Sequence, residues 1–100
     1  MDISLGQVVY SKAGRDTGRK FVIIGILESH RVMVSDGDLR RIEKAKIKKL
    51  KHLKVTEKVI LPIGEKLKNG TKVSNAEIRK ALAEIGDIED EAHNKDEVRV

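Results

Sequence analysis

Residues Arg19–Leu27 read RKFVIIGIL and are the strongest strand signal in the chain. It is rich in β-branched residues and too short for a typical helix, a combination that predicts a buried β-strand. Gly25 interrupts the apolar run, and a glycine inside a strand is typical of a bulge or of a sharp bend at the corner of a small barrel. The stretch therefore favours a small, bent β-sheet.

Shorter candidate strands lie on both sides of this stretch. Before it, Gln7–Lys12 (QVVYSK) is a run of β-formers, and after it Arg31–Ser35 (RVMVS) alternates between two faces. The sequence Asp36-Gly37-Asp38 is typical of a turn. Two further short strands are expected at Leu39–Glu43 and Lys48–Leu53. Four or five short strands at this spacing predict a mainly β fold that closes into a small barrel.

The second half of the chain has a different character. Ser74-Asn75-Ala76-Glu77 matches a capping box, and four apolar residues follow at i, i+3, i+4 and i+7 spacing from Ile78. Gly86 stands at the position of a C-cap residue. These features predict an amphipathic helix at Asn75–Ile85, with its apolar stripe packed on the barrel, on the preceding segment or on a partner. A shorter helical segment is expected over residues 62–70.

Positive charge is concentrated rather than spread along the chain. The 100 residues have a formal net charge of +5, yet Arg40–Lys54 (RRIEKAKIKKLKHLK) alone has eight Lys or Arg against a single Glu. Residues Glu84–Glu97 are acidic by contrast. A dense cationic strip on a β scaffold indicates binding to nucleic-acid backbone. The alternative is that the strip is only a solvated face.

Several functional classes lack the residues that they need. The chain has no Cys, which excludes disulfides, thiolate metal sites and a Cys nucleophile. His30, His52 and His93 lack metal-ligand spacing, and the carboxylates around Gly37 lack a partner nucleophile. The longest apolar stretch, Phe21–Leu27, is too short to span a membrane. We therefore expect a soluble cytoplasmic protein with no catalysis, metal, cofactor, small-molecule substrate or membrane contact.

The segment Ala13–Lys20 (AGRDTGRK) is the most distinctive short motif. Its two glycines let the backbone turn and approach a phosphate closely, and its basic side chains add charge. It is not a Walker loop, because three residues instead of four separate the glycines and no Ser or Thr follows Lys20. Asp16 is expected to organise the loop by pairing with Arg15 and Arg19. A plain β-hairpin turn is the simpler interpretation, and it is compatible with phosphate binding.

The small number of aromatic residues limits how the protein could recognise nucleic-acid bases. Tyr10 and Phe21 are the only aromatic residues, and both fall within predicted strands, so we expect them to pack in the barrel. Few side chains then remain that could stack on bases, so we expect weak recognition of nucleotide sequence.

A strand, then Gly-Arg-Asp-x-Gly-Arg/Lys, then a hydrophobic strand with an internal glycine resembles the KOW motif of ribosomal and transcription-elongation proteins. With the turn at residues 36–40 and the basic strip, residues 5–53 are similar to the fourteen-e family of large-subunit ribosomal proteins and its bacterial KOW-domain relatives. The resemblance implies an SH3-like barrel that binds RNA through the loop between its first two strands. The matching KOW positions are Gly6, Val8, Gly14, Asp16, Gly18, Lys20, Val22 and Gly25.

The resemblance also implies a partner and a set of contacts. The partner would be RNA, in particular ribosomal RNA or the ribosome, bound by a protein that is a monomer off the RNA. The expected contacts are Lys12, Gly14, Arg15, Gly18, Arg19 and Lys20 in the loop, and Arg40, Arg41, Lys44, Lys46, Lys48, Lys49, Lys51 and His52 in the strip.

The expected organisation is a barrel with its basic strip at residues 1–54, a helical extension at 55–86 and an acidic tail at 87–100. We expect this protein to dock on folded RNA without catalysis. A protein-interaction module of the translation or transcription machinery is the alternative. A nuclease would need a metal–carboxylate cluster or a His-based general acid and base, and the sequence has neither.

Overall fold

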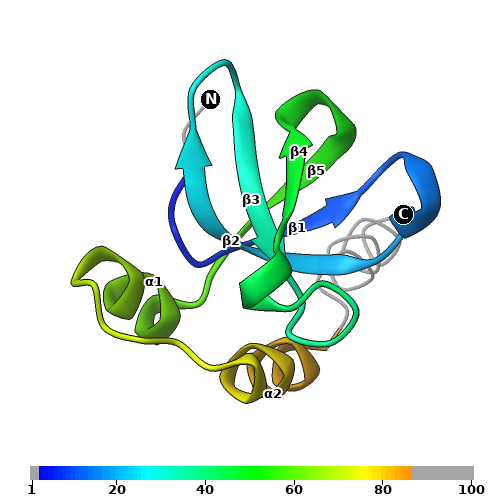
Figure 1. Cartoon of the computed structure of the whole chain (residues 1–100). Coiled ribbons are helices and arrows are strands. Elements are labelled where there is room, and N and C mark those ends of the chain that lie inside the picture. Colours follow the sequence, from blue (N-terminus) through cyan, green and yellow to red (C-terminus); the bar gives the residue numbers. More distant parts are fainter. Residues whose placement is uncertain (1–2, 87–100) are drawn as a thin grey trace, which may run out of the picture.

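The computed structural model describes residues 3–86, so the expected acidic tail at 87–100 lies outside the described residues. The described residues include a five-stranded antiparallel sheet in the order β4-β3-β2-β1-β5. The sheet bends around its own interior, and both α-helices lie together outside one side of it (Figure 1). This arrangement confirms the predicted mainly β fold, a small SH3-like barrel with a C-terminal helical extension. The elements are β1 (Gln7–Ser11), η1 (Gly14–Asp16), β2 (Lys20–Leu27), β3 (Arg31–Ser35), η2 (Ile42–Lys44), β4 (Lys46–Lys49), η3 (Leu50–His52), β5 (Leu53–Val59), α1 (Leu61–Lys68) and α2 (Asn75–Ile85).

The first half of strand β2 is buried on both of its faces. Phe21 and Ile23 point into the barrel and are fully buried, whereas Val22 lies on the opposite face under the helices. This alternation follows from the two-residue period of a strand. The pairing of β2 with β3 shifts register between Ile23 and Gly25, which confirms the predicted bulge. Tyr10 is also buried, as expected for both aromatic residues.

Helix α2 covers the outer face of the sheet. Ser74 is its N-cap residue. The Ser74 Oγ accepts the Glu77 N–H at 3.1 Å, and a Glu77 carboxylate oxygen accepts the Ser74 N–H at 3.0 Å. The buried residues Ile78 and Leu82 then pack in one cluster with Val8 of β1. The predicted capping box and helix bounds are confirmed, and the apolar stripe is buried within the chain itself.

Helix α1 occupies the segment expected to be helical, although Gly64 lies inside it. The glycine is required by close packing, since a Cβ at this position would lie 2.6 Å from the carbonyl oxygen of Leu5. The preceding strand β5 pairs with β1 and continues to Val59. The beginning of the helical extension expected at residues 55–86 is therefore part of the sheet.

Two strand predictions in the basic strip are wrong. Leu39–Glu43 forms a turn and the start of η2, because the Asp36 carboxylate accepts the backbone N–H of Arg40 at 2.9 Å and folds the chain back. Lys48–Leu53 is divided between three elements. Strand β4 ends at Lys49, and the Leu50 N–H donates to the carbonyl of His30 at 2.8 Å as η3 begins. Turn hydrogen bonds thus outweigh strand propensity in this segment.

Gly37 and Gly70 allow a matched test of how α2 is held. Both have φ of +74°, but a Cβ on Gly37 would lie 2.3 Å from the Asn75 carbonyl oxygen, whereas a Cβ on Gly70 meets nothing within 4 Å. Both Ala variants suffer the same backbone strain, and only Gly37→Ala adds a clash with α2. We expect Gly37→Ala to lose about 1–2 kcal/mol more unfolding free energy than Gly70→Ala. Urea titrations measure the difference, and equal losses would contradict close docking of α2.

Candidate nucleic-acid interface

The loop between β1 and β2 is an ordered turn. Its Gly18 N–H donates to the Ser11 carbonyl at 2.8 Å, and its Arg19 N–H donates to the Asp16 carbonyl at 2.9 Å. Gly14 and Gly18 have φ of +78° and +85°, conformations that glycine adopts without strain. The N–H groups of Gly18 and Arg19 are thus committed inside the loop. These two backbone donors are therefore not available to a ligand.

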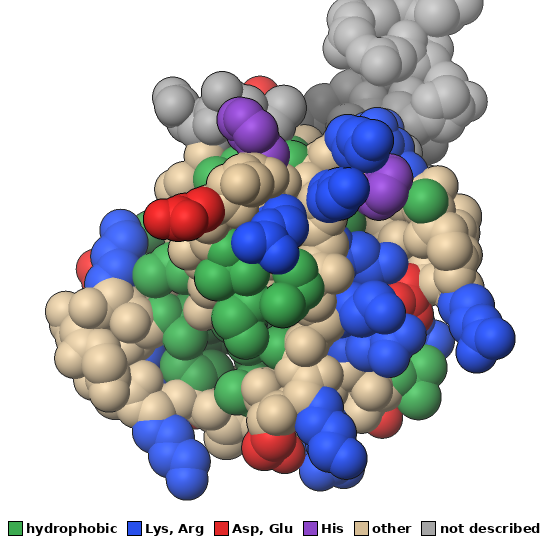
Figure 2. Space-filling view, turned by 45° about the horizontal axis from the view of Figure 1, so that its top comes forward, with side chains coloured by type: hydrophobic (Ala, Val, Ile, Leu, Met, Phe, Trp, Pro, Cys, Tyr) green, Lys and Arg blue, Asp and Glu red, His purple; other side chains and the backbone are tan. Residues whose placement is uncertain are grey.

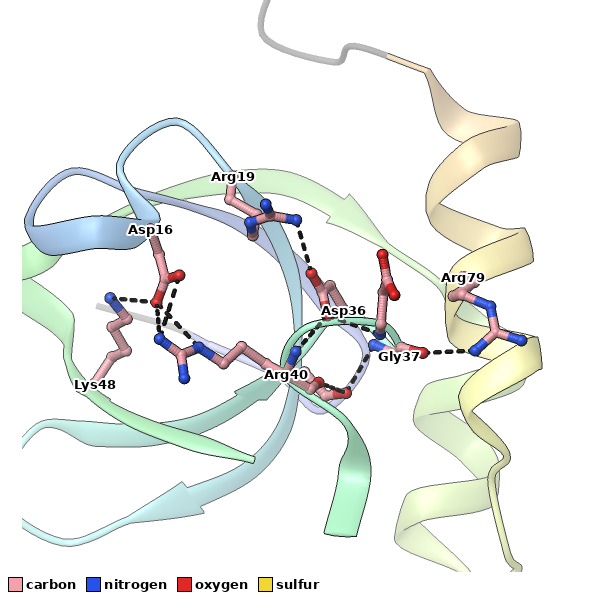
Figure 3. Close-up of polar contacts among 9 residues, drawn as sticks. Asp16, Arg19, Asp36, Gly37, Arg40, Lys48 and Arg79 are labelled. Carbon is pink, nitrogen blue, oxygen red and sulfur yellow. Dashed lines mark hydrogen bonds and ion pairs between the residues drawn. The ribbon is translucent and has the colours of Figure 1, made fainter. Parts of the chain in front are cut away.

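Asp16 lies under the loop and joins it to the basic strip (Figure 3). Its carboxylate is 3.1 Å from Arg40 Nη2 and 3.5 Å from Lys48 Nζ, and its side chain is only 7% exposed. The expected pairing with Arg15 and Arg19 is wrong. The carboxylate points into the barrel side of the loop, where residues 24 and 32 positions further along the chain supply the counter-charges. Asp16 therefore organises the loop through long-range contacts.

The environment of Asp16 favours its ionised form. Burial by itself raises the pKa of the carboxyl, but the hydrogen bonds and positive charges of Arg40 and Lys48 outweigh burial and hold the pKa below its ordinary value of 3.8. A lowered folded-state pKa stabilises the fold above the unfolded value, and this contribution disappears as the pH falls through the folded pKa.

The lowered pKa of Asp16 makes the unfolding free energy depend on pH in the acid range. Unfolding free energy is expected to decrease as the pH falls below 3.8, and Asp16→Asn is expected to make that decrease shallower. Part of the decrease remains in the variant, because hydrogen bonds to Asn75 and Lys66 lower the pKa values of Glu43 and Glu77 respectively. Urea midpoints measured across the acid range test this. Parallel curves for the two proteins would contradict a stabilising contribution from the ionised Asp16 carboxylate.

Asp36 fixes the turn from which the basic strip begins. One carboxylate oxygen accepts the N–H groups of Asp38 and Arg40 at 2.9 Å each, and the other lies 3.2 Å from Arg19 Nη1. This confirms the expectation that Asp36-Gly37-Asp38 forms a turn, with the Asp36 carboxylate holding it. Arg79 of α2 donates to the Gly37 carbonyl at 2.7 Å, so the helix holds the far side of the same turn (Figure 3).

Lys20 is committed to the end of α2. Its Nζ donates to the carbonyl of Leu82 in the last turn of α2 and to that of Gly86 at the C-cap, where helix carbonyls receive no hydrogen bond from the helix itself. A cation at a helix C-terminus also interacts favourably with the helix dipole. Four predicted contact residues are thereby engaged inside the protein, namely Arg19, Lys20, Arg40 and Lys48.

The other predicted basic residues are exposed. They lie on the loop, around η2, on β4 and on η3, and none of them makes an ion pair within residues 3–86. The Lys12 N–H donates to the His52 carbonyl at 2.8 Å, so the loop and η3 are neighbours. The exposed residues are Lys12, Arg15, Arg41, Lys44, Lys46, Lys49, Lys51 and His52.

We call Lys12, Arg15, Lys51 and His52 the basic rim, because the loop and η3 meet along one edge of the barrel. On the face drawn in Figure 2, Lys and Arg side chains gather mainly along one side of a central hydrophobic group. A hollow of about 450 Å³ lies over the loop and is lined by Tyr10 and residues 15–20. The rim thus offers, beside a shallow recess, positive charge that no carboxylate of residues 3–86 pairs with.

Sequence reasoning missed His30 and Arg31. Strand pairing places Arg31 directly opposite Lys49, and the turn that contains His30 is hydrogen-bonded to η3. Both residues lie outside the contiguous basic strip, so a count of local charge does not include them. The predicted strand at Arg31–Ser35 could have indicated them. If the basic strip that follows pairs with this strand in antiparallel fashion, its lysines lie beside Arg31.

No helix within residues 3–86 is both long and apolar enough to cross a membrane. No group of His, Asp and Glu side chains in the same residues is arranged to hold a metal ion.

The fold and the exposed charge define a class of protein, a small basic SH3-like barrel with helices packed on its outer face. No family model matches the chain. The large ribosomal subunit protein eL14 of Desulfurococcus amylolyticus is 33% identical over 85 residues, which cover 84% of this chain and 80% of that protein. The chain belongs to the eL14 family of large ribosomal subunit proteins.

Proposed function

We propose that this protein is a non-catalytic RNA-binding protein of the large ribosomal subunit and acts in the cytoplasm. The observation that carries the proposal is the exposed positive charge of the basic rim and of Lys46 and Lys49 on β4, which no carboxylate of residues 3–86 pairs with, on a fold of the eL14 family. The phosphate backbone of RNA is the polyanion that such a surface fits. No cofactor or small-molecule substrate enters the proposal.

The basic residues divide into two roles. Arg19, Arg40 and Lys48 hold the loop and the turn together through Asp16 and Asp36. The exposed residues remain to neutralise phosphates. Binding is then electrostatic docking by a preorganised surface, and contacts to phosphates position the protein without reading sequence.

The salt dependence of RNA binding tests this mechanism. If about six exposed cations neutralise phosphates, log affinity is expected to fall against log salt with a slope of about −4 to −5. Filter binding of ribosomal RNA over a range of salt concentrations gives the slope. A slope near zero would exclude phosphate neutralisation as the basis of binding.

A protein-interaction module of the translation or transcription machinery is the second candidate. Ile26, Leu39, Ile47 and Leu61 are each about half exposed or more, at 48%, 63%, 50% and 65%. Exposed apolar side chains of this size are typical of protein contacts when they are contiguous. This candidate predicts that charge reversal on the basic rim leaves co-purifying proteins unchanged, whereas the RNA proposal predicts that RNA is lost.

A further inference from the structure

A groove lies on the barrel end formed by the β2–β3 turn and η3. It has a volume of about 730 Å³, within the range of sites that bind small ligands. The residues that line it come from two segments that are separate in sequence and hydrogen-bonded in space. They are Ser29, His30, Arg31, Lys49, Leu50 and Lys51.

The groove combines positive charge with an apolar floor. Arg31, Lys49 and Lys51 are exposed and make no ion pair within residues 3–86, while Leu50 is partly buried against the barrel core. The preceding acid, Glu28, contributes its backbone carbonyl, which accepts from Arg31 Nε at 3.3 Å. An anion with an apolar or flat portion fits this lining better than a simple ion does.

The pairing of β3 with β4 sets two cations against each other. Arg31 and Lys49 are direct cross-strand partners, and like charges in this position destabilise a sheet. No carboxylate of residues 3–86 relieves the repulsion through an ion pair. A bound phosphate between the two side chains would relieve it.

The turn supplies a ring at the edge of the groove. Ser29 and His30 have φ of +62° and +58°, a conformation that glycine adopts with less strain. His30 is exposed, whereas both aromatic residues of the chain are buried in the barrel. An imidazole ring and an arginine guanidinium are two of the groups on which RNA bases stack.

We propose that this groove binds one unpaired nucleotide of RNA, with its phosphate between Arg31 and Lys49 and its base against His30 and Leu50. The inference rests on the proposed function and adds a single-stranded element to it. A base inside a duplex is stacked on its neighbours and is not free to enter the groove, so the groove selects a bulged, looped or terminal nucleotide.

His30→Asn is the decisive variant. Asn tolerates the left-handed backbone conformation and keeps the formal charge, but it removes the ring. The probes are a fluorescein-labelled single-stranded uridine decamer and an RNA duplex of equal length, measured by fluorescence anisotropy at low salt. We expect His30→Asn to weaken decamer binding roughly fivefold to tenfold and to leave duplex binding unchanged.

A double variant and a control separate charge from stacking. Arg31→Gln with Lys49→Gln is expected to reduce the salt slope for the decamer by about 1.4, because each phosphate contact to a single strand contributes about 0.7. Lys58→Gln, an exposed change on β5, is expected to leave the slope nearly unchanged. Unchanged decamer affinity in His30→Asn, or binding of the duplex alone by the wild-type protein, overturns the groove and leaves the proposed function standing. Wild-type protein that binds neither probe overturns both.

Discussion

Replacing Asp16 with Ala is expected to lower the free energy of unfolding by about 3 kcal/mol, although the residue belongs to a surface loop. Lys48 has a side chain that is 9% exposed, and it pairs in register with Val32 of the barrel core. Without Asp16 its ammonium group would stay buried with no opposite charge, and this is what makes the loss of one partner costly. The Arg40 side chain is 32% exposed, so water can solvate its guanidinium when Asp16 is removed. The expected loss of unfolding free energy is therefore at the low end of the range for buried pairs.

Two further variants show whether the buried charge is the cause. Asp38→Ala removes a carboxylate of equal charge from the exposed side of the neighbouring turn, and we expect a change within about 0.5 kcal/mol. Adding Lys48→Met to Asp16→Ala removes the orphaned ammonium, and most of the lost stability should return. Urea unfolding followed by circular dichroism measures all three proteins. If the double variant were as unstable as Asp16→Ala, an unpaired Lys48 would not be the cause.

The parts of the fold that follow from local pattern were predicted well. The strand around Phe21, its bulge at Gly25 and the capped helix α2 each depend on residues that are close in sequence. Helix capping and strand alternation are local effects, and a sequence shows them directly. The overall barrel follows because the spacing of such segments leaves few ways to pair them.

The basic strip was predicted less well because its structure depends on distant partners. Arg40 turns toward Asp16, and η2 is held by Asn75, whose side-chain oxygen accepts the Ile42 N–H at 2.8 Å. No periodicity within the strip indicates either contact. For the same reason the sequence could not divide its cations into those that hold the loop and those that face solvent.

Reversing the charge of the solvent-facing cations on the basic rim is expected to have a large effect on RNA binding. Replacing Lys12, Arg15 and Lys51 with Glu is expected to weaken binding to ribosomal RNA by at least about 100-fold and to reduce the salt slope by about three. All three side chains are exposed and make no ion pair within residues 3–86, so the fold should survive the change. Filter binding gives the affinity, and circular dichroism verifies the fold.

The matched control places the same charge change elsewhere. Lys58, Lys68 and Lys80 are exposed on β5, α1 and α2, and their replacement with Glu gives a variant of identical formal net charge. Long-range attraction depends on net charge and falls equally in both triple variants, whereas direct phosphate contacts are lost only from the rim. The rim variant should therefore bind much more weakly than the control. Equal weakening would mean that RNA is attracted by the charge of the whole protein, and that the edge where the loop meets η3 is not where phosphates bind.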